Sequence, residues 1–127
     1  MNPSVAVVIL NWNGKEFLRQ FLPGILLSEY DNLQIIVGDN ASTDGSILFL
    51  EQYFPSVKII RNNLNYGFAG GYNKVLEQVD ADYFVLLNSD VEVTPNWIRP
   101  VIELMESDGQ IAAAQPKIKS QLNKAQF

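Results

Sequence analysis

The 127-residue sequence contains no cysteine and no histidine. The absence of cysteine excludes a disulfide framework and a thiol nucleophile, and the absence of histidine excludes an imidazole base. Together the two absences also exclude a zinc site built from Cys and His ligands. A general base or a metal ligand in this chain would therefore have to be a carboxylate.

Long apolar runs and an excess of positive charge are missing as well. No apolar stretch reaches the roughly 18 residues that a membrane-spanning helix needs, and no basic leader precedes the first apolar run at Val5. We therefore expect no transmembrane segment and a cytoplasmic location. Nine Lys and Arg residues against 14 Asp and Glu residues give a net charge of −5, which argues against a nucleic-acid-binding surface. A bound phosphate would have to be held by local groups.

What the sequence does contain is the pattern of a folded α/β domain. Its residues are 47% hydrophobic and 18% charged, which is typical of a soluble protein with a core. Continuous apolar runs, which suit strands covered on both faces, alternate with segments of helical spacing. Strands are expected at Val5–Leu10, Leu33–Val37, Val57–Ile60, Tyr83–Leu87 and Ile111–Ala114. The alternation predicts a mainly parallel, doubly wound, Rossmann-like sheet with helices on both faces.

Four helices are expected between these strands, at residues 15–28, 45–54 and 71–79 and from residue 94 onward. Pro23-Gly24 should kink or break the first helix, because proline removes a backbone donor. Asp44 or Ser42 is the expected N-cap of the second helix. Thr94 is the expected N-cap of the fourth, with Pro95 at its first position.

Polar residues gather directly after the predicted strands. The clusters are Asn11-Trp12-Asn13-Gly14, residues 38–46, residues 62–73 and Asn88-Ser89-Asp90. Ligands of doubly wound sheets bind outside the carboxyl ends of the strands. The position of the clusters therefore predicts one binding site formed by several loops.

Each cluster also has a purely structural interpretation. Residues 39–46 could be a turn that caps the second helix, and residues 67–71 could be a flexible loop, since they match neither GxGxxG nor GxxxxGK[ST]. In the functional interpretation, Asp39 accepts a hydrogen bond from a nucleotide base, and the glycines let backbone N–H groups approach a phosphate or sugar. Asp90 either caps a turn or binds Mg²⁺ or Mn²⁺ together with a diphosphate. Glu92 would at most lie next to the ligands of the ion, without binding the ion itself.

Taken in order, the segments VVILNWNG, VGDNASTDGS, NLNYGFAGGYN and LLNSDVEVTPNW resemble the inverting glycosyltransferases of family 2, which have the GT-A fold. Within that family the resemblance is to the rhamnosyltransferase-like branch, and it runs from about Val5 to Ile118. It implies a nucleotide-sugar donor, a glycan or lipid-linked acceptor and transfer with inversion in cell-surface polysaccharide synthesis. The cytoplasm, or the inner face of the membrane, is the implied location.

The resemblance also implies roles by position. The implied donor-binding residues are Leu10, Asn11, Asn13, Asp39, Asn40, Gly67, Gly70, Asn73, Asn88 and Ser89. Asp90 would be the metal ligand of an Asp-x-Asp motif whose first position is Asn88 in this chain. Family members continue well beyond this length and carry the acceptor site and the general base there. We therefore expect a donor-binding part, with the general base beyond residue 127.

Other protein classes fit the sequence less well. A phosphoacceptor receiver domain would need an acidic pair where this chain has Asn11 and Asn13, and a dehydrogenase domain would need the missing glycine fingerprint. The alternative that stays open is a non-catalytic nucleotide-binding or assembly module. Apolar residues near the last predicted strand, such as Ile111 and Ile118, would favour a homodimer if exposed.

Overall fold

The computed structural model describes residues 2–108, which form two compact units. The first unit contains residues 2–23 and 31–91, and the second contains residues 24–30 and 92–108. The predicted strand Ile111–Ala114, and Ile118, lie outside the described residues.

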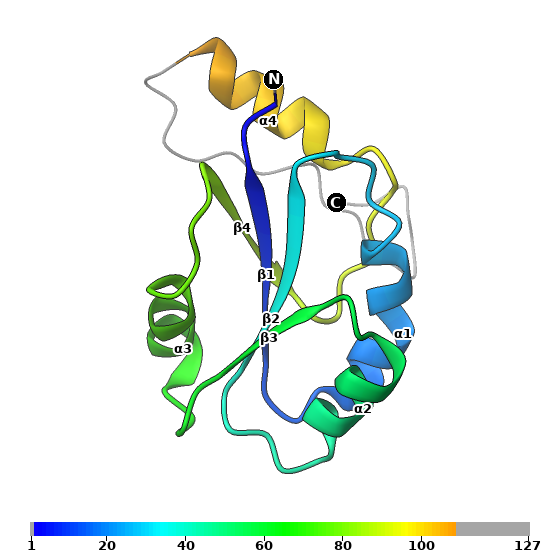
Figure 1. Cartoon of the computed structure of the whole chain (residues 1–127), viewed down its shortest axis with the longest axis vertical. Helices are drawn as coiled ribbons and strands as arrows, with labels where there is room; N and C mark the ends of the chain where they lie inside the picture. The colour runs from blue at the N-terminus through cyan, green and yellow to red at the C-terminus, as the bar shows by residue number, and fades with distance from the viewer. Residues whose placement is uncertain (1, 109–127) are drawn as a thin grey trace, which may run out of the picture. The chain divides into compact units, whose positions relative to one another are not determined.

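The first unit is built on a four-stranded parallel sheet (Figure 1). The strands are β1 (Val5–Asn11), β2 (Leu33–Asp39), β3 (Lys58–Arg61) and β4 (Tyr83–Asn88). Their spatial order is β3-β2-β1-β4. The first four predicted strands and the parallel sheet are thus confirmed. The continuous apolar run explains β1, because its residues from Val5 to Ile9 are fully buried between two neighbouring strands.

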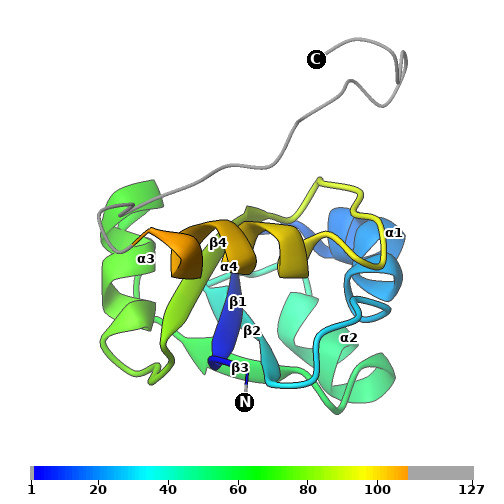
Figure 2. The ribbon, with the colours of Figure 1, turned by 90° about the horizontal axis from the view of Figure 1, so that it is seen from above.

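Helices cover both faces of this sheet, as Figure 2 shows from above: α1 (Lys15–Ile25) and α2 (Ser46–Tyr53) lie on one face and α3 (Gly67–Leu76) on the other. The Arg19 guanidinium of α1 lies 5.1 Å from the centroid of the Phe49 ring of α2, a cation–π contact between the two helices. The doubly wound α/β prediction is therefore confirmed.

The packing of α3 on the sheet depends on Gly38 in β2. A Cβ atom at this position would lie 2.5 Å from Cγ2 of Val75, which is closer than van der Waals contact allows. Val75 belongs to a buried cluster shared by the sheet and α3, together with Ala6, Val8, Ile36, Ile60, Tyr72 and Val79. Only glycine at residue 38 lets α3 approach β2 so closely.

The end of α1 and the start of α3 differ from the sequence prediction. The α1 helix contains Pro23 and ends at Ile25, so the pattern predicted to reach residue 28 stops one residue after the expected break at Pro23-Gly24. The α3 helix begins at Gly67 and not at Gly71. Gly67 adopts a left-handed φ of 76°, and its N–H donates to Asn65 Oδ1 at 2.9 Å, so the helix can start there. The glycine-rich segment thus lies within the first turns of α3 and not in a preceding loop.

The second unit contains α4 (Ile98–Ser107), which starts later than the predicted Thr94-Pro95. Pro95 and Asn96 form a turn instead. The Pro95 carbonyl accepts a 2.7 Å hydrogen bond from the Glu29 N–H, and Trp97 Nε1 donates to Ser28 Oγ at 2.8 Å. These two bonds hold Pro95 and Trp97 against residues 28 and 29, where the sequence pattern predicts the first turn of the helix. None of the described helices is long and apolar enough to cross a membrane.

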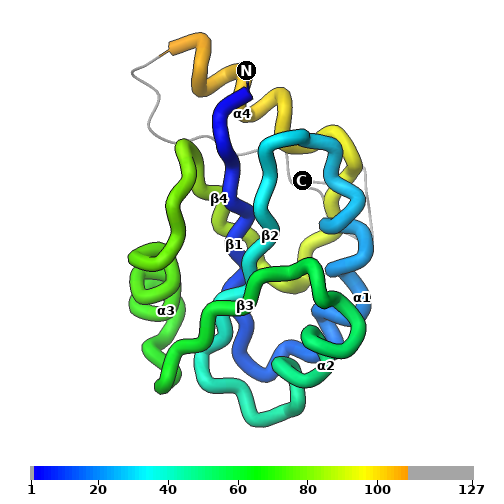
Figure 3. Tube along the Cα trace, viewed as in Figure 1, coloured from blue at the N-terminus to red at the C-terminus, as the bar shows by residue number. Residues whose placement is uncertain are grey.

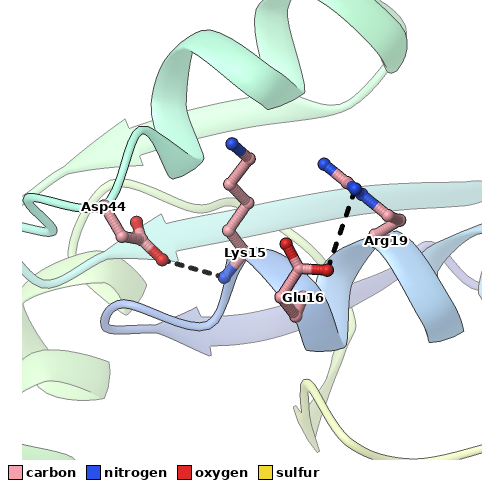
Figure 4. Close-up of polar contacts among 4 residues, drawn as sticks. All are labelled: Lys15, Glu16, Arg19 and Asp44. Atoms are coloured by element: carbon pink, nitrogen blue, oxygen red, sulfur yellow. Dashed lines mark hydrogen bonds and ion pairs between the residues drawn. The ribbon is translucent and has the colours of Figure 1, made fainter.

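Asp44 joins the start of α1 to the start of α2 (Figure 4). Its Oδ2 accepts a 3.0 Å hydrogen bond from the Lys15 N–H, which Figure 4 shows as a dashed line. Its Oδ1 accepts from the Ser46 N–H at 3.0 Å and from the Ser46 hydroxyl. Desolvation raises the pKa of Asp44, but these hydrogen bonds together outweigh it and hold the pKa below its ordinary value of 3.8. The N-cap position of α2 is Gly45, so the prediction of Asp44 or Ser42 at that position is wrong. Asp44 lies one residue earlier and still accepts the first N–H of the helix.

We predict that Gly38→Ala destabilises the protein by about 1–3 kcal/mol, because the new methyl group overlaps Val75. Chemical denaturation followed by circular dichroism measures the change. Gly24→Ala is the matched control, since a Cβ there meets nothing within 4 Å, and it should be neutral or stabilising. Adding Val75→Ala to Gly38→Ala should reduce the penalty of the glycine substitution; an unchanged penalty would contradict the overlap.

We predict that Asp44→Asn lowers stability only where the carboxylate is ionised. Because the folded-state pKa lies below 3.8, the charged form stabilises the fold above that pH, and this contribution is lost as pH falls through the folded-state pKa. At pH 7 the variant should lose roughly 0.5–1 kcal/mol, the usual size for a charge at a helix N-terminus. Urea unfolding across acidic and neutral pH measures the difference, and a gap that stays constant at acid pH would contradict it.

Candidate functional site

The strand order reverses between β1 and β4, since β2 and β3 lie on one side of β1 and β4 lies on the other. Open α/β sheets bind ligands at the carboxyl ends of the strands beside such a reversal. The register pairs Asn11 with Asp39 and Leu10 with Asn88, so three of the predicted polar clusters start at the same edge. Figure 3 shows the chain leaving β1 and β2 at the same end of the sheet.

The ends of β1 and β2 are joined by buried polar side chains. Asn11 is fully buried and Asp39 is 2% exposed, and Asn11 Nδ2 donates to Asp39 Oδ1 at 2.9 Å. The second carboxylate oxygen of Asp39 accepts from the Ser42 N–H at 2.9 Å. Ser42 Oγ in turn accepts from the Asn13 N–H at 2.9 Å and from Asn11 Nδ2 at 3.2 Å. These hydrogen bonds fix the loop after β1 and the loop after β2 relative to each other.

Both of these loops contain a residue with left-handed backbone. Asn13 has a φ of 50° and Ala41 a φ of 63°, which for alanine is an uncommon and strained conformation. The Asn13 side chain also joins the two loops, because its Oδ1 accepts a 2.7 Å hydrogen bond from the Thr43 N–H. Strained backbone of this kind clusters at functional sites.

The ends of β2 and β3 and the start of α3 are joined through Asn40, which is 2% exposed. Asn40 Nδ2 donates to Asn65 Oδ1 at 3.0 Å and to the Gly67 carbonyl at 2.9 Å. Asn40 Oδ1 accepts from Asn62 Nδ2 at 2.9 Å and from the Tyr66 N–H at 3.3 Å. Four partners hold this one amide in place.

Two glycines of α3 lie close to this network. A Cβ on Gly71 would lie 2.7 Å from Asn40 Nδ2 and 3.0 Å from Leu10 Cδ1. A Cβ on Gly70 would lie 3.2 Å from Tyr66 Cβ. The glycine-rich start of α3 is therefore closely packed against the polar strand ends.

The buried polar groups of the site are already satisfied inside the protein. Among residues 2–108, every buried side-chain nitrogen or oxygen atom has a hydrogen-bond partner. Contacts to a ligand must then come mainly from the exposed groups. Beside the strand ends these include Trp12, which is 57% exposed, and the exposed side chains of Asn13, Asn88 and Asp90.

Asp90 is the exposed carboxylate that follows β4. Within the described part of the chain its side chain makes no hydrogen bond or ion pair, so both of its oxygens are accessible. Residues 2–108 contain no group of three or more acidic side chains that could hold a metal ion by itself. The donor set fits only an ion that takes most of its ligands from elsewhere, such as water and phosphate oxygens.

Tyr72 of α3 ties the helix to β4. Its hydroxyl donates to the Leu87 carbonyl at 3.1 Å, and burial raises the pKa of Tyr72 above its ordinary value of 10.0. The phenol therefore stays protonated at neutral pH, and its role is structural.

Several implied site residues are brought together, and others are not. Hydrogen bonds link Asn11 to Asp39 and Asn40 to Gly67. A Cβ on Gly14, in the loop after β1, would lie 3.5 Å from Ser89 Oγ, so Ser89 is close to that loop. Asn73 is exposed on α3, and its side chain bonds to none of the other candidates in the described region.

The sequence pattern predicts only a helix cap for Ser42 and no particular role for Asn62 or Asn65. All three lie inside the polar clusters, but spacing alone does not reveal which side chain turns inward. Only their partners do, since Ser42 contacts the β1–α1 loop and the two asparagines contact Asn40.

Comparison with known proteins adds a family to this geometry. Residues 6–126 match the family model described as glycosyl transferase family 2. An uncharacterized glycosyltransferase of Haemophilus influenzae is 30% identical over 114 residues, which is 87% of this chain and 35% of that protein. An N-acetylglucosaminyl-diphospho-decaprenol L-rhamnosyltransferase of Mycobacterium tuberculosis is 24% identical over 130 residues, which is 94% of this chain and 42% of that protein.

Solved structures show the same fold. A mannosyltransferase of Pyrobaculum calidifontis, in complex with GDP-Man and Mn²⁺, has a TM-score of 0.67 at 22% identity and covers 72% of this chain and 29% of its own. S. aureus TarS in complex with UDP-GlcNAc has a TM-score of 0.71 at 17% identity and covers 82% of this chain and 31% of its own.

The family assignment rests on nearly the whole sequence, although the chain spans only 35–42% of the length of the two curated relatives. The structural likeness confirms the predicted GT-A type of α/β fold. The chain belongs to glycosyl transferase family 2, as its four strand-end motifs predict.

Proposed function

We propose that this chain binds the nucleotide-sugar donor of an inverting glycosyl transfer reaction at the carboxyl ends of β1, β2 and β4. The observation that carries the proposal is the strand reversal between β1 and β4. The Asp90 carboxylate, which has no partner among residues 2–108, follows one strand, and the ordered Asn11–Asn13 loop follows the other. Two of the structural neighbours hold nucleotide sugars, which supports the same class of ligand here.

In this proposal the base of the nucleotide lies over the loop from Leu10 to Asn13 and the end of β2 at Asp39 and Asn40. The ribose and diphosphate lie near the start of α3, at Gly67, Gly70 and Asn73. A helix N-terminus suits a diphosphate because its free N–H groups carry partial positive charge.

Asn88, Ser89 and Asp90 lie at the diphosphate end of the proposed site. Asp90 would hold Mg²⁺ or Mn²⁺ together with phosphate oxygens and water, which fits the finding that residues 2–108 contain no group of three or more acidic side chains able to hold an ion by themselves. The ion, when bound, neutralises the charge that develops on the leaving diphosphate. The P. calidifontis structure contains Mn²⁺ beside GDP-Man, which supports this assignment.

The proposed reaction joins the sugar to an acceptor hydroxyl. The hydroxyl oxygen attacks the anomeric carbon, the bond from that carbon to the diphosphate oxygen breaks, and the hydroxyl proton passes to a general base. We propose that acceptor binding and the base belong to sequence beyond residue 127, so that residues 1–127 act as the donor-binding part. The name of the M. tuberculosis relative specifies a lipid-linked acceptor, which supports a glycan or lipid-linked acceptor here. We further propose that the transfer takes place at the inner face of the membrane.

We predict that the chain binds at least one of UDP, GDP and dTDP in the presence of Mn²⁺, and that Asp90→Asn weakens this binding by about tenfold or more. Even groups that only support a metal ligand are worth that much in affinity. Isothermal titration calorimetry with and without Mn²⁺ measures the effect. The expected result is a metal-dependent affinity in the native chain that the variant loses.

Asp80→Asn is the matched control, because it makes the same charge change on an exposed residue that precedes β4 at the opposite end of the strand. Its affinity should equal that of the native chain. Equal binding by all three proteins, or binding that does not depend on Mn²⁺, would remove Asp90 from the metal site. Absence of binding by the native chain to all three nucleotides would overturn the donor-site proposal.

We further predict that the chain by itself transfers no sugar from a nucleotide sugar that it binds. The measurement is release of nucleoside diphosphate in the presence of an acceptor. Transfer by residues 1–127 alone would contradict the placement of the base beyond them. Nucleotide binding with no transfer even by a longer chain that includes the following sequence would favour the non-catalytic alternative.

A further inference from the structure

Asn40 is the buried residue on which the segment from Asn62 to Gly71 converges. Its side-chain amide has two hydrogens to donate and two lone pairs to accept, and the structure uses all four. Such a fully occupied amide has no group left for a ligand. Asn40 must therefore act on a ligand through the segment that it holds.

The orientation of this amide is determined by backbone groups. Its nitrogen faces the Gly67 carbonyl, which only accepts, and its oxygen faces the Tyr66 N–H, which only donates. Turning the amide over would place oxygen against oxygen at Gly67 and N–H against N–H at Tyr66. Asn40 must consequently present a donor on one side and an acceptor on the other.

A carboxylate cannot do this, although the shape of Asp is nearly that of Asn. In an Asp at this position, the second oxygen would face Asn65 Oδ1 and the Gly67 carbonyl, both of which are acceptors. A buried carboxylate between two acceptor oxygens is strongly unfavourable. The side chain would have to be protonated, or the segment would have to move away.

The neighbouring Asn65 needs only an acceptor, whereas Asn40 needs both a donor and an acceptor. Its Oδ1 accepts from Asn40 Nδ2 and from the Gly67 N–H, and its Nδ2 makes no hydrogen bond within residues 2–108. Asn65 is also exposed. A carboxylate at residue 65 would keep both accepting roles and leave its charge in water.

We infer that Asn40 is a positioning residue, whose amide holds the Asn62–Gly71 segment and the first turn of α3 in the conformation that meets the donor, and that this role requires Asn and excludes Asp. The part of the inference that concerns the donor rests on the proposed function, whereas the part that concerns the segment does not. The role differs from the direct base contact that the family resemblance implies for Asn40.

The first test needs no ligand and compares Asn40→Asp with Asn65→Asp. Both variants add one negative charge to the same hydrogen-bond network. They differ in that residue 40 is buried and uses its donor, whereas residue 65 is exposed and its Nδ2 makes no hydrogen bond within residues 2–108. We measure hydrogen exchange of the Tyr66 and Gly67 amides by NMR in the 14.3 kDa chain. Asn40→Asp should lower the protection of these amides by about tenfold or more at pH 7, and Asn65→Asp should leave it unchanged.

The pH dependence distinguishes a lost donor from a general loss of stability. When the new carboxyl group of Asn40→Asp is protonated, its O–H can again donate to the Gly67 carbonyl. Protection in Asn40→Asp should therefore recover as pH falls, with an apparent pKa above about 4, the ordinary value for Asp. Asn40→Ala has no proton to regain and should show no recovery.

Equal loss of protection in Asn40→Asp and Asn65→Asp, or no loss in either, would overturn the inference. Protection of the β1 amides reports whether each variant is folded. If Asn40→Asp does not fold, Asn65 carries the test: Asn65→Ala should lower Gly67 protection and Asn65→Asp should preserve it, and equal values would contradict the network.

The second test asks whether the segment matters for the donor. Titration with UDP, GDP and dTDP plus Mn²⁺ should show weaker binding in Asn40→Asp than in Asn65→Asp, because repulsion of the diphosphate by the added charge is common to both. Equal affinities in the two variants would overturn the positioning role toward the donor. If the native chain binds none of the nucleotides, the proposed function fails, while the exchange result still decides whether Asn40 organises the segment.

Discussion

The burial of β1 in the middle of the sheet is the constraint on which the site depends. Because β2 and β4 pair with both of its edges, the polar residue at its carboxyl end, Asn11, is fully buried. A buried amide without partners would be strongly destabilising, so Asn11 needs Asp39 and Ser42. Those two partners determine how the chain leaves β2. The fixed conformation of the loops after β1 and β2 is therefore a consequence of the burial of β1.

Buried and exposed polar groups therefore have different roles at this edge of the sheet. The buried carboxylate and amides at the ends of β1 and β2 bind one another and the backbone, and they give the loops a single conformation before any ligand arrives. The groups left for a ligand are exposed ones, such as Asn88 at the end of β4 and Asp90 just after it. Such preorganisation is what a donor site needs, because ordering loops at the moment of binding would reduce affinity.

The physical basis of the sequence prediction explains where it succeeded and where it was wrong. Continuous apolar runs identified four strands, because a strand buried on both faces excludes polar residues wherever it occurs. Helix starts were less predictable. Thr94-Pro95 has the residue types of a helix start, yet the chain there bonds to Glu29, and α4 begins at Ile98. The glycines before Gly71 were assigned to a loop, yet the Asn65 side chain lets α3 begin at Gly67.

The sequence by itself determined the α/β class, the parallel sheet and the edge at which polar residues meet, since these depend on residue types repeated along the chain. It also carried the four motifs that place the chain in glycosyl transferase family 2. Only the tertiary structure decided which polar side chains are buried. Asn40 and Asn65 are the same residue type in similar polar surroundings of the sequence. Among the residues that the structure describes, however, Asn40 has all four of its hydrogen-bonding positions occupied and Asn65 uses only its oxygen. That difference arises from contacts between segments far apart in the chain, which no local pattern records.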